Sequence, residues 1–406
     1  MTVAIASRQL QVLPEVAAEL DHLIALRRDI HAHPELCYEE VRTSDLVARK
    51  LQEWGIEVVR GLGGTGLVGI LRSGNSPRAI GLRADMDALP MQEDNTFAHA
   101  SQHPGKMHAC GHDGHTATLL GAAQYLAKHR IFNGTVYFIF QPAEEGGAGA
   151  RAMIEDGLFT RFPMDAVFGF HNWPGLPAGD VAASPGPVMA SSNEFHITLR
   201  GKGGHAALPH TANDPVPVAC QLVQAFQTIV SRSISPIDSA VISVTMLEAG
   251  DATNVIPESC TLQGTVRTFT LEVLDHVEQR MRVLSENLAR GFGMECEFDF
   301  KRNYPPTINS REEAHFIHEV ASSVLGAHHV HKQVPTMAAE DFSFMLQHKP
   351  GCYFFIGNGD GSHRMADHGG GPCTLHNGSY DFNDALLPAG ATLWVKVVER
   401  WLAPVL

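Results

Sequence analysis

The sequence predicts an α/β fold, in which a mostly parallel sheet is sandwiched by helices and a smaller α+β domain is inserted. Short apolar runs alternate with helical stretches in the first half, which is typical of a parallel sheet. The middle combines alternating strands with two long helices, and the end returns to helices. At 406 residues the chain exceeds the usual span of one hydrophobic core, so two domains are expected.

Two amphipathic helices open the chain, and apolar runs with the length of buried strands follow them. Gly55 ends the second helix, and Pro34 lies just beyond the first. The predicted helices are 20–30, 41–54, 116–128 and 149–156, and the predicted strands are 67–71, 79–82, 135–140 and 166–170.

The middle of the chain predicts a compact α+β module of the ferredoxin-like kind. Its expected strands are 194–200, 240–247 and 260–268, and its expected helices are 215–231 and 271–290. After it come helices at 312–325 and 385–402, with a strand at 352–356 between them. The larger domain is therefore discontinuous, over 1–187 and 305–406, and the inserted domain covers 188–304.

Composition narrows the functional classes. A net charge of −14 without a basic cluster argues against nucleic acid as a partner. No apolar run is long enough to span a membrane, and residues 1–12 do not resemble a signal peptide. The seven cysteines are odd in number and scattered, which favours a reducing compartment. We therefore expect a cytoplasmic protein.

The stretch Gly61–Gly66 fits the pattern GxGxxG of dinucleotide-binding folds. In those folds the motif opens a helix whose N-terminus holds the pyrophosphate. Here the strand-like run 67–71 follows instead, so a turn between strands is the preferred interpretation.

Residues that can bind metal ions follow three of the predicted strands. Asp85 and Asp87 come after one strand, Glu144 and Glu145 after the next, and His171 after a third. Sites in α/β sheets gather beyond the carboxyl ends of the strands, so these side chains can converge although they are far apart in sequence.

A fourth ligand-rich place is the stretch 107–115, which contains Cys110 and His112, and His376 adds one imidazole near the C-terminus. Thiolate and imidazole suit zinc, and carboxylates widen the choice to manganese or cobalt. Three alternatives stay open: Cys110 as a nucleophile with His112 as its base, Glu144 as part of a solvated helix start, and His376 as an ordinary surface histidine.

These motifs resemble those of the dinuclear metallopeptidase family M20, which includes aminoacylases and glutamate carboxypeptidases. The similarity is greatest to its amidohydrolase subfamily, with hippurate hydrolases, auxin–amino-acid conjugate hydrolases and N-acetyl-diaminopimelate deacetylases. It extends from about residue 20 to the C-terminus. The matching stretches are 28–35, 83–90, 107–115, 141–145, 203–205, 253–257, 339–342 and 375–376.

The resemblance implies two divalent metal ions per subunit, zinc or manganese, with cobalt or nickel as alternatives. Cys110 would bridge the two ions in place of the aspartate of most other branches. Many relatives have a histidine where Asp85 stands, which makes Asp85 a doubtful ligand, whereas Asp87 would orient a ligand histidine. The implied ligands are Cys110, His112, Glu145, His171 and His376.

The resemblance also implies an activity, the cleavage of the amide bond of small N-acyl amino acids. Glu144 would be the general base and acid. The inserted domain would be a lid and dimerisation domain, whose His205 reaches the active site of a neighbouring subunit in a homodimer or tetramer. Asn254 and Arg267 would bind the substrate's carboxylate, since arginine pairs with carboxylates through two hydrogen bonds.

Two other functions remain open at this point. One is a dipeptidase or carboxypeptidase of the same family, and the other is a catalytically silent metal-binding protein on this scaffold. Glu144 and a full ligand set argue against the silent protein. The sequence leaves the acyl group, the preferred amino acid and the native metal undetermined.

Overall fold

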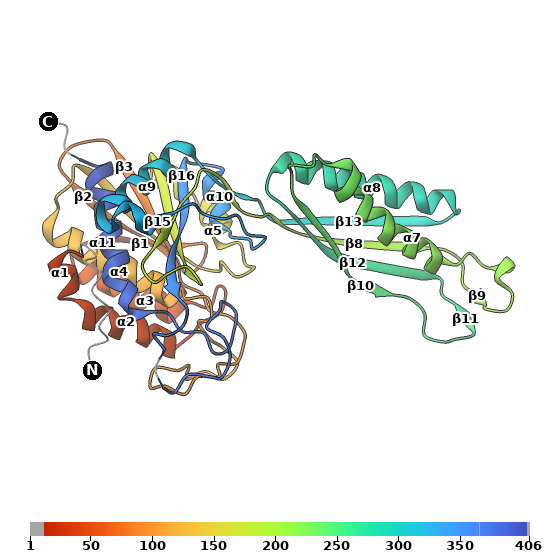
Figure 1. Cartoon of the computed structure of the whole chain (residues 1–406), viewed down its shortest axis with the longest axis horizontal. Helices are drawn as coiled ribbons and strands as arrows, with labels where there is room; N and C mark the ends of the chain where they lie inside the picture. The colour runs from red at the N-terminus through yellow and green to blue at the C-terminus, as the bar shows by residue number, and fades with distance from the viewer. Residues whose placement is uncertain (1–11, 365, 404–406) are drawn as a thin grey trace. The chain divides into compact units, whose positions relative to one another are not determined.

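The computed structural model describes residues 12–364 and 366–403, which form two compact units (Figure 1). Unit 1 runs to Gly186 and resumes over Asn309–Val334 and from Phe344 onwards; unit 2 comprises Pro187–Ile308 and Pro335–Ser343. Residues 335–343, predicted to lie in the larger domain, are part of unit 2 instead. The segment belongs to unit 2 because the Thr336 amide donates to the Val188 carbonyl, 3.1 Å away. Residues 1–11, compared above with a signal peptide, lie outside the described residues.

Unit 1 is built on an eight-stranded sheet, and its central strands β4, β3, β5 and β16 run parallel. The carboxyl ends of these strands therefore meet at one edge of the sheet. The expected mostly parallel sheet is confirmed. In spatial order the strands are β1 (Glu57–Leu62), β2 (Gly66–Ser73), β4 (Gly134–Gln141), β3 (Ala79–Asp85), β5 (Ala166–Pro174), β16 (Gly351–Gly359), β6 (Val181–Ala182) and β15 (Val330–His331).

Helices cover this sheet, and every residue of its central strand β3 is buried. Alternate residues of a strand face opposite sides, so Phe138 and Phe140 join the core formed with α2, α4 and α11. Tyr137, one position away, packs against Phe162 instead. The helices are α1 (Pro14–Ala17), α2 (Leu20–Ala32), α3 (Val41–Glu53), α4 (His112–His129), α5 (Gly149–Glu155), α6 (Leu158–Arg161), α9 (Arg311–Leu325), α10 (Phe342–Leu346) and α11 (Leu387–Trp401).

The stretch Gly61–Gly66 lies in the turn between the antiparallel strands β1 and β2. Its Leu62 pairs with Gly66, and Gly63 and Gly64 both have positive φ angles. Glycine adopts this backbone conformation without a Cβ clash, which explains the motif as turn chemistry. No helix follows that could hold a pyrophosphate.

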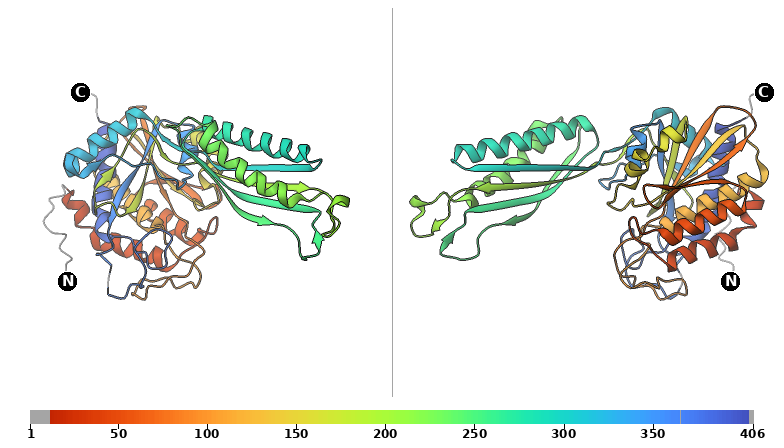
Figure 2. Two further views of the ribbon diagram at one scale, coloured as in Figure 1. Left: turned by 45° about the vertical axis from the view of Figure 1, so that its right-hand side comes forward. Right: turned by 180° about the vertical axis from the view of Figure 1, so that it is seen from behind.

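Unit 2 is a four-stranded antiparallel sheet in the order β10-β12-β8-β13, with α7 (Pro215–Thr228) and α8 (Leu271–Gly291) on one face, as the views in Figure 2 show. The chain order β-α-β-β-α-β is the ferredoxin-like arrangement. Inward residues of β8, such as Ile197, pack against Leu222 of α7 and Val277 of α8. The strands are β8 (Ser192–Arg200), β10 (Ala240–Glu248), β12 (Ser259–Thr268) and β13 (Glu295–Tyr304).

Two small ribbons complete the described fold, β9 (Gly204–His205) with β11 (Val255–Ile256), and β7 (Gly186–Met189) with β14 (Thr307–Asn309). Strand β13 was not predicted individually, because charged residues alternate with its half-buried Cys296, Phe298 and Phe300. Within the described residues, no helix is both long enough and apolar enough to cross a bilayer.

Candidate metal centre

The five predicted ligands lie at the carboxyl ends of the parallel strands of unit 1. His171 is part of β5, and Glu145 lies in the loop that follows β4. Cys110 and His112 flank Gly111, whose φ of 87° places it just before α4. His376 comes from the loop between β16 and α11, and its amide donates to the Ala109 carbonyl at 2.9 Å. The fold therefore brings together segments separated by more than 260 residues (110 to 376).

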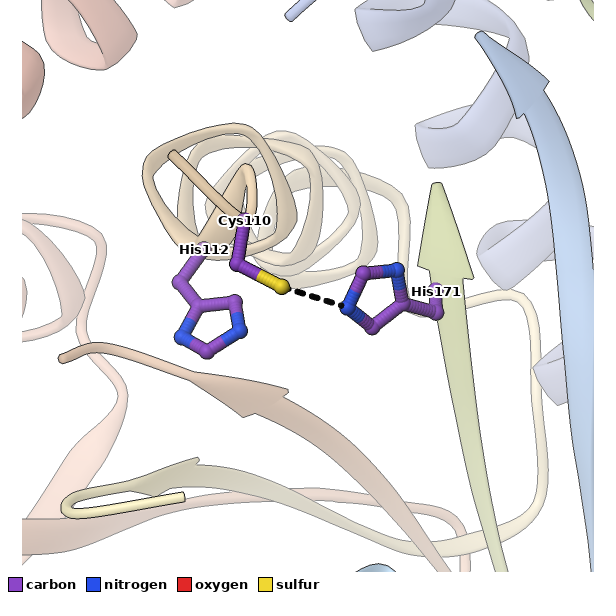
Figure 3. Close-up of side chains that lie close together, drawn as sticks. All are labelled: Cys110, His112 and His171. Atoms are coloured by element: carbon purple, nitrogen blue, oxygen red, sulfur yellow. Dashed lines mark hydrogen bonds between the residues drawn. The ribbon is translucent and has the colours of Figure 1, made fainter. Parts of the chain in front are cut away.

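The ligand atoms form two clusters that share the Cys110 sulfur. One contains Cys110, His112 and His171, and the other contains Cys110, Glu145 and His376; within each, the atoms lie within 4.8 Å of one another. Figure 3 shows the first cluster, in which Cys110 Sγ lies 3.2 Å from His171 Nε2. A sulfur common to two clusters is the geometry that a bridging ligand requires.

Hydrogen bonds determine which nitrogen each imidazole presents to the cluster. His112 Nδ1 lies 3.2 Å from Asp87 Oδ1, and His171 Nδ1 donates to the Asn172 carbonyl at 2.6 Å. Both rings are thereby left with Nε2 facing the cluster. His112 Nε2 is buried and has no hydrogen-bond partner among the described residues. An unsatisfied buried nitrogen next to a thiol fits a metal ligand well.

Acidic side chains surround the candidate metal centre and shift the pKa values of its cysteine and histidine. Burial raises the pKa of the Cys110 thiol, and the nearby Glu145, Glu144 and Asp85 raise it further. Burial opposes a charge on His112, but Asp85 and Asp87 nevertheless raise its pKa to about 10. A divalent cation placed among these groups would reverse both preferences, because it stabilises a thiolate and a neutral imidazole. The donor set therefore matches a cation site.

Asp85 is already engaged by other groups. Its Oδ2 accepts from Arg83 Nη1 at 2.6 Å, and its Oδ1 lies 2.6 Å from His115 Nδ1. With both oxygens occupied by buried partners, Asp85 is poorly placed to bind an ion.

Asp87 connects several of the ligand-bearing segments. Besides His112, it accepts from the Glu145 amide at 2.9 Å and from the Cys37 thiol at 3.2 Å. Glu144 is buried, and its carboxylate lies within 4.8 Å of the ligand atoms of His112 and Glu145. Sequence reasoning missed Cys37, although it lies just after the matching stretch 28–35.

The predicted catalytic residue His205 and the predicted substrate-binding residues Asn254 and Arg267 all belong to unit 2. His205 and Asn254 line the same open cavity of about 680 Å³, at the ribbon formed by β9 and β11. Arg267 lies in a separate cavity of about 380 Å³ on the sheet, next to Glu194. None of the ion pairs among the described residues involves Arg267. Burial lowers the pKa of its guanidinium, and the charge of Glu194 opposes that shift.

The model of Peptidase family M20/M25/M40 matches residues 81–400. This range contains the five predicted ligands and the five other predicted site residues, Asp87, Glu144, His205, Asn254 and Arg267. The chain belongs to peptidase family M20. An M20 relative, the hippurate hydrolase of Campylobacter jejuni, is 41% identical over 394 residues, which cover 97% of this chain and 100% of that protein. Thermostable carboxypeptidase 1 of Saccharolobus solfataricus is 40% identical over 342 residues, or 83% and 86% of the two chains.

A solved M20 structure extends the similarity to the whole fold. The YXEP protein of Bacillus subtilis, described as a dinuclear metal-binding peptidase, superposes with a TM-score of 0.83 at 32% identity and covers 96% of this chain and 99% of its own. The membership in M20 and its amidohydrolase branch predicted from the motifs is confirmed. The protein is a metal-dependent amidohydrolase.

Proposed function

We propose that the protein uses two divalent metal ions to hydrolyse the amide bond of N-acyl amino acids, which releases a carboxylic acid and a free amino acid. This proposal rests mainly on Cys110, which belongs to two ligand clusters, and on the buried Glu144 beside them. A hippurate hydrolase, 41% identical over almost the whole chain, supports the substrate class.

In this proposal, His112 and His171 would hold one ion, Glu145 and His376 would hold the other, and Cys110, which belongs to both clusters, would be a ligand of each. Sulfur, nitrogen and oxygen donors together favour zinc or manganese, and cobalt and nickel can also be accommodated. When bound, the ions would polarise the amide carbonyl and lower the pKa of water towards ~7.

Glu144 is proposed as the proton carrier of the reaction. It accepts the proton of the attacking water and delivers it to the leaving amine nitrogen. Its neighbour Glu145 is held differently, because its amide donates to Asp87 and its carboxylate lies 3.1 Å from His376 Nε2. Adjacent glutamates thereby divide proton transfer and ligation between them.

Unit 2 is proposed to recognise the substrate. His205 would donate to the developing oxyanion from a neighbouring subunit of a homodimer, and Asn254 and Arg267 would bind the carboxylate.

All seven cysteines are free, which supports a cytoplasmic location. The acyl group could be aromatic, as in hippurate, or acetyl. A carboxypeptidase activity is the second candidate, since a carboxypeptidase is among the 40% identical relatives.

The deciding experiment is a substrate panel. The protein, reconstituted with zinc or manganese, is assayed against benzoylglycine, N-acetyl amino acids and dipeptides, with Glu144→Gln as the matched variant. We expect turnover of the N-acyl amino acids, lost by about 100-fold or more in Glu144→Gln while both metal ions remain bound. Faster cleavage of dipeptides would favour the carboxypeptidase. No turnover of any substrate would favour the silent metal-binding protein.

A further inference from the structure

A buried histidine lies next to the two ligand clusters that share Cys110 and belongs to neither of them. His115 is 1% exposed and lies on α4, one turn after His112. Its Nδ1 is 2.6 Å from Asp85 Oδ1, and its Nε2 is 3.0 Å from both the backbone and the side-chain nitrogen of Asn172. A nitrogen that accepts from an amide carries no proton, so His115 is the neutral tautomer with its hydrogen on Nδ1. Both of its nitrogens are therefore occupied, which leaves none for a metal ion.

Asn172 is the residue that His115 orients. Its side-chain nitrogen also donates to the Cys110 carbonyl at 2.7 Å, and its side-chain oxygen accepts from the Tyr380 hydroxyl at 2.8 Å. Its own carbonyl accepts from His171 Nδ1. Asn172 thus makes contacts with the two neighbouring ligands through separate atoms. The side chains of Asn172 and Tyr380 pack closely against Gly111. A Cβ atom added at Gly111 would lie 2.4 Å from both Asn172 Nδ2 and the Tyr380 hydroxyl.

We propose that Asn172, held by His115 and Tyr380, is a positioning residue that fixes Cys110 and His171 at the separation needed to share one metal ion. This inference rests on the proposed dinuclear site. Cys110 belongs to a turn and His171 to a strand, and Asn172 hydrogen-bonds to both, through its side-chain nitrogen to the Cys110 carbonyl and through its own carbonyl to the His171 ring. Residues of this kind behind a metal site change metal affinity by about 10- to 100-fold when they are replaced.

Asn309 provides a matched control. It is buried in unit 1. Its side-chain nitrogen donates to the Ser184 carbonyl at 3.0 Å and the Tyr353 carbonyl at 2.8 Å, and its oxygen accepts from the Tyr353 amide, so its side chain makes three hydrogen bonds, as that of Asn172 does. Asn172→Leu and Asn309→Leu therefore remove comparable hydrogen bonds from comparable surroundings. Only the first removes a side-chain bond to a metal-ligand residue, the bond to the Cys110 carbonyl. The backbone carbonyl of residue 172, which accepts from His171, is present in both variants.

The test uses cobalt(II) as the metal probe on the full chain. Cobalt affinity is measured by chelator competition, and the thiolate-to-cobalt absorption reports the Cys110 bond without any turnover. We expect Asn172→Leu to bind one of the two cobalt ions at least about tenfold more weakly, with a weaker thiolate absorption. We expect Asn309→Leu to match the wild type in both measurements.

Tyr380→Phe is the milder variant, which decides the question if Asn172→Leu does not fold. It removes only the hydroxyl that orients Asn172, and we expect weaker cobalt binding with the fold retained. Wild-type affinity in Asn172→Leu or Tyr380→Phe, or an equal loss in Asn309→Leu, would overturn the positioning role. Absence of the thiolate absorption in the wild-type protein would instead overturn the dinuclear site itself.

Discussion

Asp87 contacts three groups that surround the candidate metal centre. One carboxylate oxygen lies 3.2 Å from His112 Nδ1, and the other accepts from the Glu145 amide and the Cys37 thiol. Burial raises the pKa of Asp87, but the hydrogen bond and charge of His112 and the hydrogen bond from the Glu145 amide together outweigh it, so the net shift is downward. An ionised Asp87 keeps the hydrogen of His112 on Nδ1, which leaves Nε2 free for a metal ion.

Replacing Asp87 with asparagine tests this orienting role. An asparagine amide can present its nitrogen instead of an oxygen to His112, so the imidazole loses its fixed tautomer. We expect Asp87→Asn to weaken zinc or manganese binding by about 10- to 100-fold, measured by chelator competition. Asp165→Asn, which changes a carboxylate bonded only to the Ala79 amide among the described contacts, serves as the control. Unchanged affinity in Asp87→Asn would remove Asp87 from the metal centre.

Helix α2 inserts two cations into a buried group of carboxylates. Arg27 bonds to Asp381 and Asp384, and His31 lies 2.9 Å from Asp113 Oδ2 and 3.1 Å from Glu93 Oε1. Burial opposes a charge on His31, yet Asp113 and Glu93 raise its pKa to about 10. These pairs join α2 to the first turn of α4 and to the 381–384 segment, which follows the loop of His376. The helix therefore supports two ligand-bearing segments at once.

The raised pKa of His31 predicts a stability profile with pH. A group whose folded pKa is raised contributes fully below its ordinary value near 6.5, and this contribution is lost as pH rises towards 10. The surrounding rings do not compensate, because burial lowers the pKa of His99 and lowers that of His108 to about 4. We expect unit 1 to lose stability steadily between these pH values.

His31→Gln isolates this contribution. It leaves Asp113 and Glu93 buried without their cation, which should lower the free energy of unfolding by about 3–5 kcal/mol near neutral pH. The four tryptophans, Trp54, Trp173, Trp394 and Trp401, all lie in unit 1, so their fluorescence in denaturant reports its unfolding. The wild type should lose more stability than the variant between pH 6.5 and 10, because the variant lacks the contribution of His31, whereas His112, whose pKa is also raised to about 10, acts in both proteins. Parallel profiles for the two proteins would show that His31 carries no buried charge.

At the scale of the whole molecule, the candidate site residues are divided between two units. The metal cluster and Glu144 belong to unit 1, and His205, Asn254 and Arg267 belong to unit 2. The chain carries a net charge of −14, so an anionic substrate needs a local cation to bind. We propose that Arg267, which takes part in none of the described ion pairs, supplies this cation.

Arg267→Ala should therefore act on substrates that carry a free carboxylate. We expect the KM for an N-acyl amino acid to rise by about tenfold to 100-fold, in line with about 1.5–3 kcal/mol for a hydrogen bond to a charged group. The KM for the corresponding amino-acid amide should change little. Arg200→Ala, whose guanidinium is paired with Glu297, is the control. Equal increases for the acid and the amide would contradict carboxylate binding.

The proposed sharing of active sites between subunits is testable by mixing two inactive variants. Glu144→Gln and His205→Ala would each disable every site of its own homodimer. In a mixed dimer, one site would combine the intact Glu144 of one subunit with the intact His205 of its partner, so activity should return. Mixed dimers verified by a tag on one variant, yet without activity, would show that each subunit completes its own site.

The sequence by itself determined the family, the mostly parallel sheet and the identity of the candidate ligands. The set Cys110, His112, Glu145, His171 and His376 could be named because of the resemblance to family M20. Their residue types suit metal ions, and Glu145 and His171 also follow apolar strands, where sites in α/β sheets gather. The start of α4 was predicted at 116 but lies at His112, because the polar run 112–115 has no apolar helical periodicity.

Only the tertiary structure decided how the buried polar groups pair. Hydrogen bonds between distant segments pair Asp85 with His115 and Cys37 with Asp87, and they place Asn172 between Cys110 and Tyr380. The same is true of the separation of Arg267 from the cavity of His205 and Asn254. Such pairings depend on distances across the fold, and residue type and local spacing carry no information about those distances.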